Sequence, residues 1–262
     1  MERIEAKEKI LQDKLSYSGL NNIYIACYEE VDSTMNVASQ IATKVGINNF
    51  ALVSAERQTA GRGRNDHIWE SPKNGNLYFT FLINVKSLPK DVSSFSLIVS
   101  VVLLDVIKEN LGIQEDKLCL KWPNDILDTK GKKLSGILIE TEKNQNGYTI
   151  MIGIGLNITD APCTNSVSLS EITNVGISKE EILADIILSI SDAWRNFNKK
   201  GFKDYKDIWL KYCGYIGKQI EICSTSIKEK GKMVGINDVG ALLLDVDGTI
   251  KEYYSGDVYT RV

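Results

Sequence analysis

The chain predicts an α+β fold, with a central mixed β-sheet and helices on one face, followed by a small β-barrel. Strand-like and helix-like stretches are mixed without regular β-α-β alternation, which disfavours a doubly wound sheet. From Cys213 onward, short β-rich runs alternate with turns, as in small barrels. A length of 262 residues allows one large and one small domain. We expect a short leader at residues 1–21, a main domain at 22–212 and the barrel at 213–262.

The composition excludes several classes of protein. Lys and Arg number 31 against 34 Asp and Glu, a net charge of −3, which argues against a DNA partner. Five cysteines without C-x-x-C spacing and one histidine disfavour a zinc site or disulfide framework, and indicate a reduced, cytoplasmic protein. No signal peptide is visible, and the longest apolar run falls short of the roughly 20 residues that span a bilayer. We therefore expect neither a DNA nor a membrane partner.

The chain begins with a charged, helix-prone stretch at residues 1–20, which we expect to be frayed and too short for a DNA-binding domain. Ile23 to Tyr28 predicts a strand. Asp32-Ser33-Thr34 then opens a helix to about Lys44. Such residues cap helices, and the free N–H groups and hydroxyls at a helix start can also bind a polar ring.

A polar, glycine-rich loop lies between two predicted strands, Phe50 to Ala55 and Leu77 to Val85, the second with one buried face. Loops of this length are usually functional or disordered. In Gly61-Arg62-Gly63-Arg64 the glycines let the backbone approach a ligand, and the arginines present guanidinium forks. The alternative is a solvated loop. The pattern favours a site for phosphate or carboxylate.

A long helix is predicted from Asp91 to Asn110, ending at Gly112. Leu118 to Lys121 follows as a short strand that ends at Trp122-Pro123, because proline cannot continue a ladder. The ammonium of Lys121 suits a carboxylate or phosphate oxygen, although a surface lysine is the plainer interpretation.

Leu134 to Glu142 and Tyr148 to Ile158 predict a hairpin around the turn Asn146-Gly147. Gly153-Ile154-Gly155 lies inside the second strand. It lacks the third glycine and the following helix of a dinucleotide fingerprint, so we read the glycines as permitting close approach of a ligand or another backbone.

The remaining elements are two helices and the barrel strands. Ser178-Lys179-Glu180-Glu181 predicts a capping box that opens an amphipathic helix, and a second helix follows at about Phe202 to Tyr212. The barrel strands are expected at Gln219 to Cys223, Lys232 to Asn237, Ala241 to Val246 and Ile250 to Tyr254.

Together these motifs resemble the biotin–protein ligase family, whose members adenylate biotin and attach it to a carrier lysine. The resemblance covers roughly residues 22–262. The motifs that carry it are Asp32-Ser33-Thr34, the loop from Gln58 to Trp69, Lys121-Trp122-Pro123-Asn124-Asp125-Ile126, Lys133 to Glu140 and Gly153 to Ile158. The loop and the Lys-Trp-Pro-Asn-Asp block are specific. Asp66 and His67 replace a glycine and an arginine that are usual in the family loop, which leaves open how its second half folds.

The resemblance implies a role for each matching residue. Lys121 and Arg64 would be catalytic. The biotin-binding residues would be Ser33, Thr34, Met35, Gln58, Gly61, Arg62, Gly63, Arg64, Lys121 and Gly136. The nucleotide-binding residues would be Arg64, Trp69, Asn124, Lys133 and Asn157.

The resemblance also implies ATP and Mg²⁺ as cofactors, biotin as substrate, and a biotin carboxyl carrier protein or domain as partner. It implies no metal ligands from the protein alone. It makes the C-terminal barrel SH3-like, and it leaves a homodimer open.

Three alternatives remain at this point. A lipoate or octanoate ligase or transferase belongs to the same superfamily, and a non-catalytic biotin-binding module would not need Lys121 and both arginines. Ala241 to Ile250 also resembles the nucleophile motif of haloacid dehalogenase-like phosphatases, with Asp245 as nucleophile and Asp247 as acid and base. Too few residues follow for that fold, and an Asp247-Gly248 hairpin turn explains the same sequence.

Overall fold

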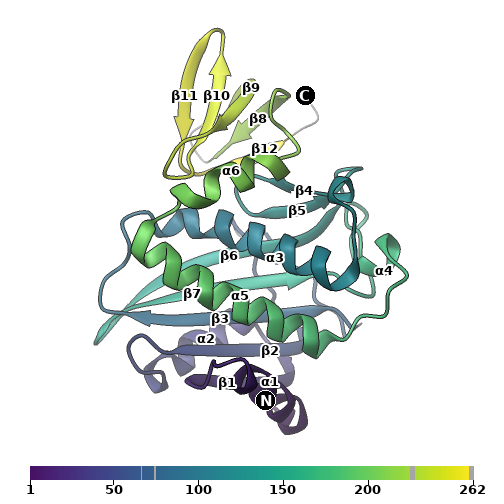
Figure 1. The fold of residues 1–262 in the computed structure, drawn as a ribbon, viewed down its shortest axis with the longest axis vertical. Coiled ribbons are helices and arrows are strands. Elements are labelled where there is room, and N and C mark those ends of the chain that lie inside the picture. Colours follow the sequence, from purple (N-terminus) through teal and green to yellow (C-terminus); the bar gives the residue numbers. More distant parts are fainter. Residues whose placement is uncertain (66, 74, 225–227, 260–262) are drawn as a thin grey trace.

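The computed structural model describes residues 1–65, 67–73, 75–224 and 228–259. Within these ranges the main sheet has seven strands in the order β1-β2-β3-β7-β6-β5-β4 (Figure 1). Its strands are β1 (Ile23–Val31), β2 (Phe50–Gln58), β3 (Leu77–Val85), β4 (Leu118–Lys121), β5 (Asp125–Asp128), β6 (Lys133–Asn144) and β7 (Gly147–Leu156). β1 and β2 are parallel and the other neighbours are antiparallel, which confirms a mixed sheet.

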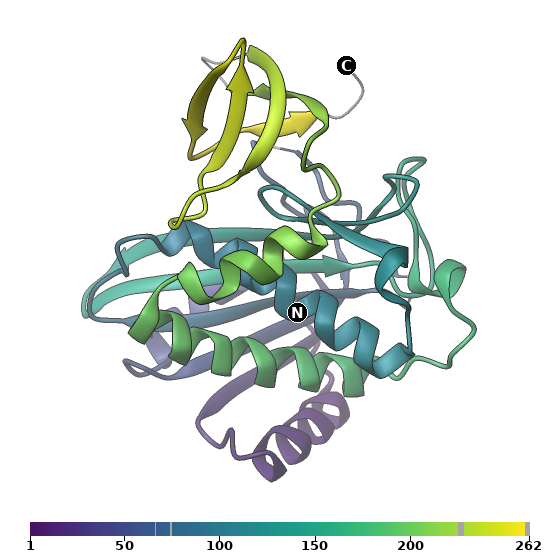
Figure 2. The ribbon, with the colours of Figure 1, turned by 45° about the horizontal axis from the view of Figure 1, so that its top comes forward.

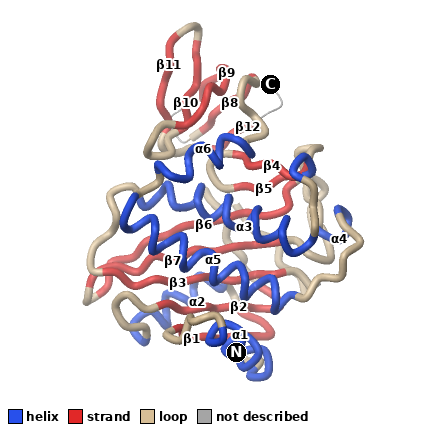
Figure 3. Tube along the Cα trace, viewed as in Figure 1, coloured by secondary structure: helices blue, strands red, loops and turns tan. Residues whose placement is uncertain are grey.

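A second, smaller sheet follows at the C-terminal end, with the order β11-β10-β9-β8-β12 (Figure 3). Its strands are β8 (Gln219–Cys223), β9 (Lys228–Ile236), β10 (Leu242–Val246), β11 (Thr249–Tyr253) and β12 (Asp257–Tyr259). All its neighbours are antiparallel. The first four strands match the expected ones within a few residues, and β12 was not expected. Figure 2 shows that α6 (Lys203–Tyr212) leads into this sheet.

Two long helices, α3 (Phe95–Leu111) and α5 (Lys179–Lys200), cover one face of the main sheet. The expectation that all helices lie on one face is wrong, because α2 (Thr34–Ile41) packs against the opposite face. Its apolar side meets Ala51, Val53 and Ala55 of β2 and Met151 of β7, which point away from α3 and α5. This cover also explains why β3 is buried on both faces rather than on one. The remaining short helices are α4 (Leu169–Ile172) and the 3₁₀ turns Ala42–Lys44, Val92–Ser94 and Glu115–Lys117.

The first residues form part of the core, contrary to the expected frayed leader. α1 (Glu5–Tyr17) packs on β1 and α5, with Leu11 and Leu15 fully buried. An apolar residue every four positions was too sparse a signal to indicate burial in so charged a stretch.

The segment before and within α1 also closes the free edge of β1. Four hydrogen bonds join it to that edge: Ile4 N to Cys27 O (2.8 Å), Glu29 N to Glu2 O (3.2 Å), Arg3 Nη2 to Ile25 O (2.9 Å) and Cys27 N to Glu8 Oε1 (2.8 Å). Backbone groups that would otherwise be open on an edge strand are therefore satisfied within the chain.

Local signals set several other boundaries. α3 ends where Gly112 adopts the left-handed conformation at φ 61°, and β4 has the expected limits. Ser178 caps α5 by accepting from the Glu181 N–H, while a full capping box occurs at Ser168 and Glu171, where we did not expect one. Asp247 and Gly248 both have positive φ between β10 and β11, which confirms the hairpin-turn interpretation of that motif.

Candidate functional site

A cavity of about 430 Å³ opens where the main sheet meets the glycine-rich loop and the C-terminal sheet. Most residues that the sequence singled out line it. They are Ser33, Thr34, Met35, Gln58, Arg62, Gly63, Arg64, Trp69, Lys121, Asn124, Lys133, Gly136 and Asn157. Gly61 does not line the cavity. Their roles stay predictions, but the fold brings these separate segments to one place.

The start of α2 and the end of β2 form one end of the cavity. The Gln58 side-chain oxygen accepts from Thr34 N (2.8 Å) and Thr34 Oγ1 (3.1 Å), and Gln58 Nε2 donates to Ser71 Oγ (2.9 Å). Thr80 Oγ1 donates to Thr34 Oγ1 at 2.9 Å. Ser33, Thr34 and Thr80 are buried, so this end is a rigid network of neutral hydrogen-bonding groups.

Two side chains confirm the predicted cap at the start of α2. Ser33 Oγ accepts from the Met35 N–H at 3.3 Å. Asn36 donates to the Asp32 carboxylate, as does the Ser33 N–H, and together they hold the pKa of Asp32 below its ordinary value. The cap therefore fixes the position of Ser33 and Thr34 at the cavity.

The glycine-rich loop folds back on itself. Gly63 N donates to His67 O (2.7 Å), and Trp69 N donates to Gly61 O (2.9 Å). A Cβ on Gly61 would lie 2.3 Å from Trp69 O, so only glycine fits where the loop closes. Gly61 thus acts on the shape of the loop and not as part of the cavity wall. How Asp66 contributes lies outside the described residues.

The indole of Trp69 lies on the surface of β6 and β7 at the paired residues Gly136 and Gly155. A Cβ on Gly155 would lie 2.2 Å from the indole, and one on Gly136 would lie 2.9 Å from it. A Cβ on Gly153 would likewise meet Met35 Sδ at 2.8 Å. The strand glycines therefore permit close approach, as the sequence indicated, here by side chains of the cavity wall.

The four Arg and Lys side chains on the cavity wall are each paired with a carboxylate. Arg62 Nη2 lies 2.8 Å from Glu140 Oε2, and Arg64 Nη1 lies 3.3 Å from Asp257 Oδ1. Lys121 Nζ and Lys133 Nζ lie 3.5 Å and 2.7 Å from the two oxygens of Asp125. A bound anion would meet these cations already gathered and oriented.

Arg64 and Asn65 connect the loop to the C-terminal sheet. Arg64 Nη1 donates to Gly256 O (3.1 Å), and Asn65 Nδ2 donates to Asp257 Oδ2 (2.6 Å). The carboxylate that pairs with Arg64 among the described residues is therefore that of Asp257. Because β12 itself was not expected, sequence reasoning missed Asp257 as a cavity residue.

Three buried polar atoms of the cavity wall have no hydrogen-bond partner among the described residues: Trp69 Nε1, Asn157 Oδ1 and Asp125 Oδ1, the last of which lies in an ion pair with Lys133. The Asn157 amide nitrogen is used, since it donates to Lys133 O (3.3 Å) and Val167 O (3.1 Å). Asn124 donates to Ile137 O at 2.6 Å. An unused buried donor and acceptor are costly unless a ligand satisfies them, so both suit contacts to a polar ligand.

The cavity gives little support to a cysteine nucleophile or to a metal site. Cys163 lines the cavity, but burial, and then the neighbouring Glu70 carboxylate, raise the pKa of its thiol, so it is not an activated nucleophile. In the part of the chain that the structure covers, no three His, Cys, Asp or Glu side chains gather as a metal site. No helix in the same ranges has the length and apolar character needed to cross a membrane.

Two family models match the chain. The Biotin/lipoate A/B protein ligase family model matches residues 28–157, and the Biotin protein ligase C terminal domain model matches residues 215–261. The second match covers the small C-terminal sheet, in agreement with the expected fold.

Known proteins and solved structures agree with these models. The Bifunctional ligase/repressor BirA of Bacillus subtilis (strain 168) is 31% identical over 257 residues, covering 94% of this chain and 75% of that protein. The Biotin--[acetyl-CoA-carboxylase] ligase of Paracoccus denitrificans is 30% identical over 223 residues, covering 81% of this chain and 90% of that protein. The structure of the biotin protein ligase from Aquifex aeolicus in complex with biotin and ATP has a TM-score of 0.76 at 29% identity, covering 90% of this chain and 97% of that chain. The chain therefore belongs to the biotin protein ligase family.

Proposed function

We propose that the chain activates biotin with ATP as biotinyl-5'-AMP and transfers the biotinyl group to a lysine of a biotin carboxyl carrier protein. One observation carries the proposal: a single cavity joins a neutral hydrogen-bonding end to an end lined by four cations. That combination suits a ligand with an uncharged polar ring and an anionic group, the two ends of biotinyl-adenylate.

The neutral end suits the biotin head. The hydroxyls of Ser33 and Thr34 and the amide of Gln58 offer both donors and acceptors to a ureido ring. Their mutual hydrogen bonds fix these groups before the ligand arrives, which reduces the ordering that binding requires. Met35, packed on Gly153, adds an apolar wall.

The cationic end of the cavity suits the adenylation of biotin. When the biotin carboxylate attacks the α-phosphorus of ATP and pyrophosphate leaves, negative charge concentrates on the oxygens around phosphorus, and fixed cations stabilise it. Lys121 would act as a point charge between carboxylate and α-phosphate, and Arg62 and Arg64 would hold the acyl phosphate by their guanidinium forks. Trp69, Asn124, Lys133 and Asn157 would contact the nucleotide.

Mg²⁺ enters as part of the MgATP substrate. With no cluster of three candidate ligand side chains in the described ranges, triphosphate oxygens and water would supply most of its coordination. The protein's part is then to hold the phosphates, while the bound ion neutralises part of their charge.

In the transfer step, the amine of the carrier lysine attacks the acyl carbonyl and AMP leaves. The mixed anhydride reacts with water, so a closed loop over it favours transfer over hydrolysis. The contact of Arg64 and Asn65 with β12 supports such a closed position.

We further propose a cytoplasmic location, which agrees with the five free cysteines. We also propose that the chain has no DNA partner. A homodimer stays an open alternative.

The decisive experiment is biotin-dependent exchange of labelled pyrophosphate into ATP, followed by addition of a purified carrier domain. We expect exchange with biotin alone, and carrier labelling that requires the acceptor lysine. Absence of exchange in the presence of biotin, ATP and Mg²⁺ would refute the proposed function.

A further inference from the structure

One carboxylate in the cavity has no role in the function proposed above. Asp125 is the first residue of β5, where its Cα pairs with Lys121 of β4 on one side and Gly136 of β6 on the other. It is only 8% exposed. Its position between two strands places a buried negative charge at the centre of the cationic end of the cavity.

The Asp125 carboxylate is shared by two lysines. Oδ1 lies 2.7 Å from Lys133 Nζ, and Oδ2 lies 3.5 Å from Lys121 Nζ. Neither contact is an ideal hydrogen bond: the first lacks hydrogen-bond geometry, and the second is long. Asp125 therefore holds both ammonium groups without using all their donors, which leaves those donors available to another anion.

Lys133 is also held on its other sides. Its Nζ lies 5.2 Å from the centre of the Trp69 ring, and a Cβ on Gly136 would lie 2.9 Å from it. The ammonium thus lies between the carboxylate, the indole and the bare backbone of β6. Without Asp125, the ammonium groups of Lys121 and Lys133 would repel each other at the cavity wall with no carboxylate between them.

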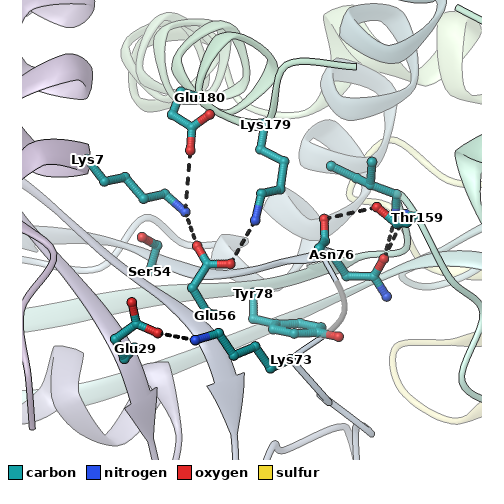
Figure 4. A network of polar contacts seen from close by, with 12 residues as sticks. Lys7, Glu29, Ser54, Glu56, Lys73, Asn76, Tyr78, Thr159, Lys179 and Glu180 are labelled. Atoms are coloured by element: carbon teal, nitrogen blue, oxygen red, sulfur yellow. Dashed lines mark hydrogen bonds and ion pairs between the residues drawn. The ribbon is translucent and has the colours of Figure 1, made fainter. Parts of the chain in front are cut away.

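Glu56 is another carboxylate that lies between two lysines, and it is not part of the cavity wall. Glu56 of β2 lies 2.7 Å from Lys7 Nζ of α1 and 2.7 Å from Lys179 Nζ of α5 (Figure 4). Burial alone would raise the pKa of Glu56, but the hydrogen bonds from Lys179 and Lys7 outweigh it and hold the pKa below its ordinary value. This group joins three elements of the fold, and none of its members lines the cavity.

We propose that Asp125 is a positioning residue for ATP: it places Lys121 and Lys133 at the phosphate subsite and is the negative charge with which an incoming phosphate group competes. The inference rests on the proposed function. It assigns two opposite effects to one carboxylate. Asp125 weakens ground-state binding of a polyanion, because the anion must displace it, and it speeds adenylation, because it keeps Lys121 in place.

The test is Asp125→Asn, which keeps the shape of the side chain and removes its charge. We expect the adenylation kcat to fall on the order of tenfold, while the KM for ATP stays the same or falls. A merely damaged pocket would instead raise KM. An increased KM at unchanged kcat would overturn the proposal.

A second readout needs no reaction. We expect inorganic pyrophosphate with Mg²⁺ to raise the melting temperature of Asp125→Asn by more than it raises that of the wild type, because a ligand that binds only the folded state stabilises it more at the same concentration when its affinity is higher. Pyrophosphate should raise the melting temperature of Lys133→Met by less than it raises that of the wild type. This variant also keeps the proposal testable if Asp125→Asn fails to fold. Equal pyrophosphate shifts in all three proteins would overturn the proposal.

Glu56→Gln is the matched control, since it also removes a carboxylate between two lysines. Its stabilising effect is present above the unfolded pKa of Glu56 and lost as pH falls through the lower folded pKa. The variant should therefore melt lower at pH 7 and depend less on acid pH, with the pyrophosphate shift and kcat unchanged. Failure of the proposed function would appear separately, as a wild type that binds pyrophosphate but forms no biotin-dependent adenylate.

Discussion

The two ends of the cavity are built from different interactions. At one end, Thr34, Gln58 and Thr80 bond to one another as neutral groups. At the other end, each cation is held by a carboxylate such as Glu140 or Asp125. The hydrogen bonds at the neutral end fix its groups in position before a ligand binds, whereas the charged end holds its cations on carboxylates that an anion must replace.

This difference gives the two ends of the cavity different roles. A fixed set of neutral donors and acceptors rejects a ligand that lacks matching groups, because buried polar atoms would be left unpaired. Cations held by carboxylates are less selective, but they are oriented for charge that develops during the reaction. We therefore expect substitutions at the neutral end to change which acid binds, and substitutions at the charged end to change rates and retention of the intermediate.

The largest effect is expected from Lys121→Gln, which keeps a polar side chain of nearly the same length and removes the charge. Adenylation should slow on the order of a hundredfold or more, since one such donor is typically worth about 2.7–4 kcal/mol. Transfer from pre-made biotinyl-adenylate should be less affected, because the phosphorus chemistry is then complete. Single-turnover measurement of both half-reactions checks this. Near-normal adenylation would reduce Lys121 to a structural lysine of β4.

Ligand choice tests the neutral end. Biotin should bind at least about a hundredfold tighter than lipoate, roughly 2.7 kcal/mol, because a dithiolane leaves the groups around Thr34 and Gln58 unpaired. Calorimetry with both acids on the same preparation measures the difference. Equal affinities would contradict the assignment of this end to the biotin head.

Arg64→Gly tests whether the charged end retains the intermediate. Adenylate formation should survive, because Lys121 and Arg62 remain, but the adenylate should escape and label unrelated lysines several-fold more than the wild type does. The measurement is a biotin blot of a lysine-rich bystander protein incubated with each enzyme, biotin and ATP. Normal transfer to the carrier with no bystander labelling would show that Arg64 does not clamp the adenylate.

The smallest effect is expected from Asp257→Asn, which removes the charge that Arg64 meets in the C-terminal sheet. Both side chains are partly exposed, and such pairs are worth about 0–1 kcal/mol, so bystander labelling should rise by no more than about fivefold. Glu140→Gln is the matched control, because it releases Arg62 without touching the C-terminal sheet. A larger effect from Asp257→Asn than from Arg64→Gly would mean that the C-terminal sheet, and not the arginine, retains the adenylate.

Local patterns predicted the elements that depend on neighbouring residues. The limits of β4, the end of α3 at Gly112 and the Asp247-Gly248 turn each follow from a few adjacent residues. The site residues from Ser33 to Asn157 came from the family resemblance instead; most of them line one cavity, and their roles stay predictions.

Features that depend on distant contacts could not be predicted. The burial of α1, and of the second face of β3 beneath α2, depends on which elements pack against each other. Sequence periodicity does not specify that. Asp257 lies in a strand of three residues, too short to give a pattern, and it reaches the cavity only because the main sheet and the C-terminal sheet meet there. Asp125 was visible in a motif, but its pairing with Lys133 depends on the register of β5 and β6.

The contact of the first residues with β1 has a practical consequence for shortened versions of the protein. The family model begins its match at residue 28, so a fragment designed from that match alone would lack Glu2, Arg3, Ile4 and Glu8. Such a fragment would also lose residues 23–27 of β1, so the backbone of β2 that pairs with them would be open to a strand from another molecule, and the apolar surface beneath Leu11 and Leu15 would face water. Fragments that begin at residue 28 should self-associate in a concentration-dependent way during purification, and affinity tags are better placed ahead of residue 1 than in place of the first helix.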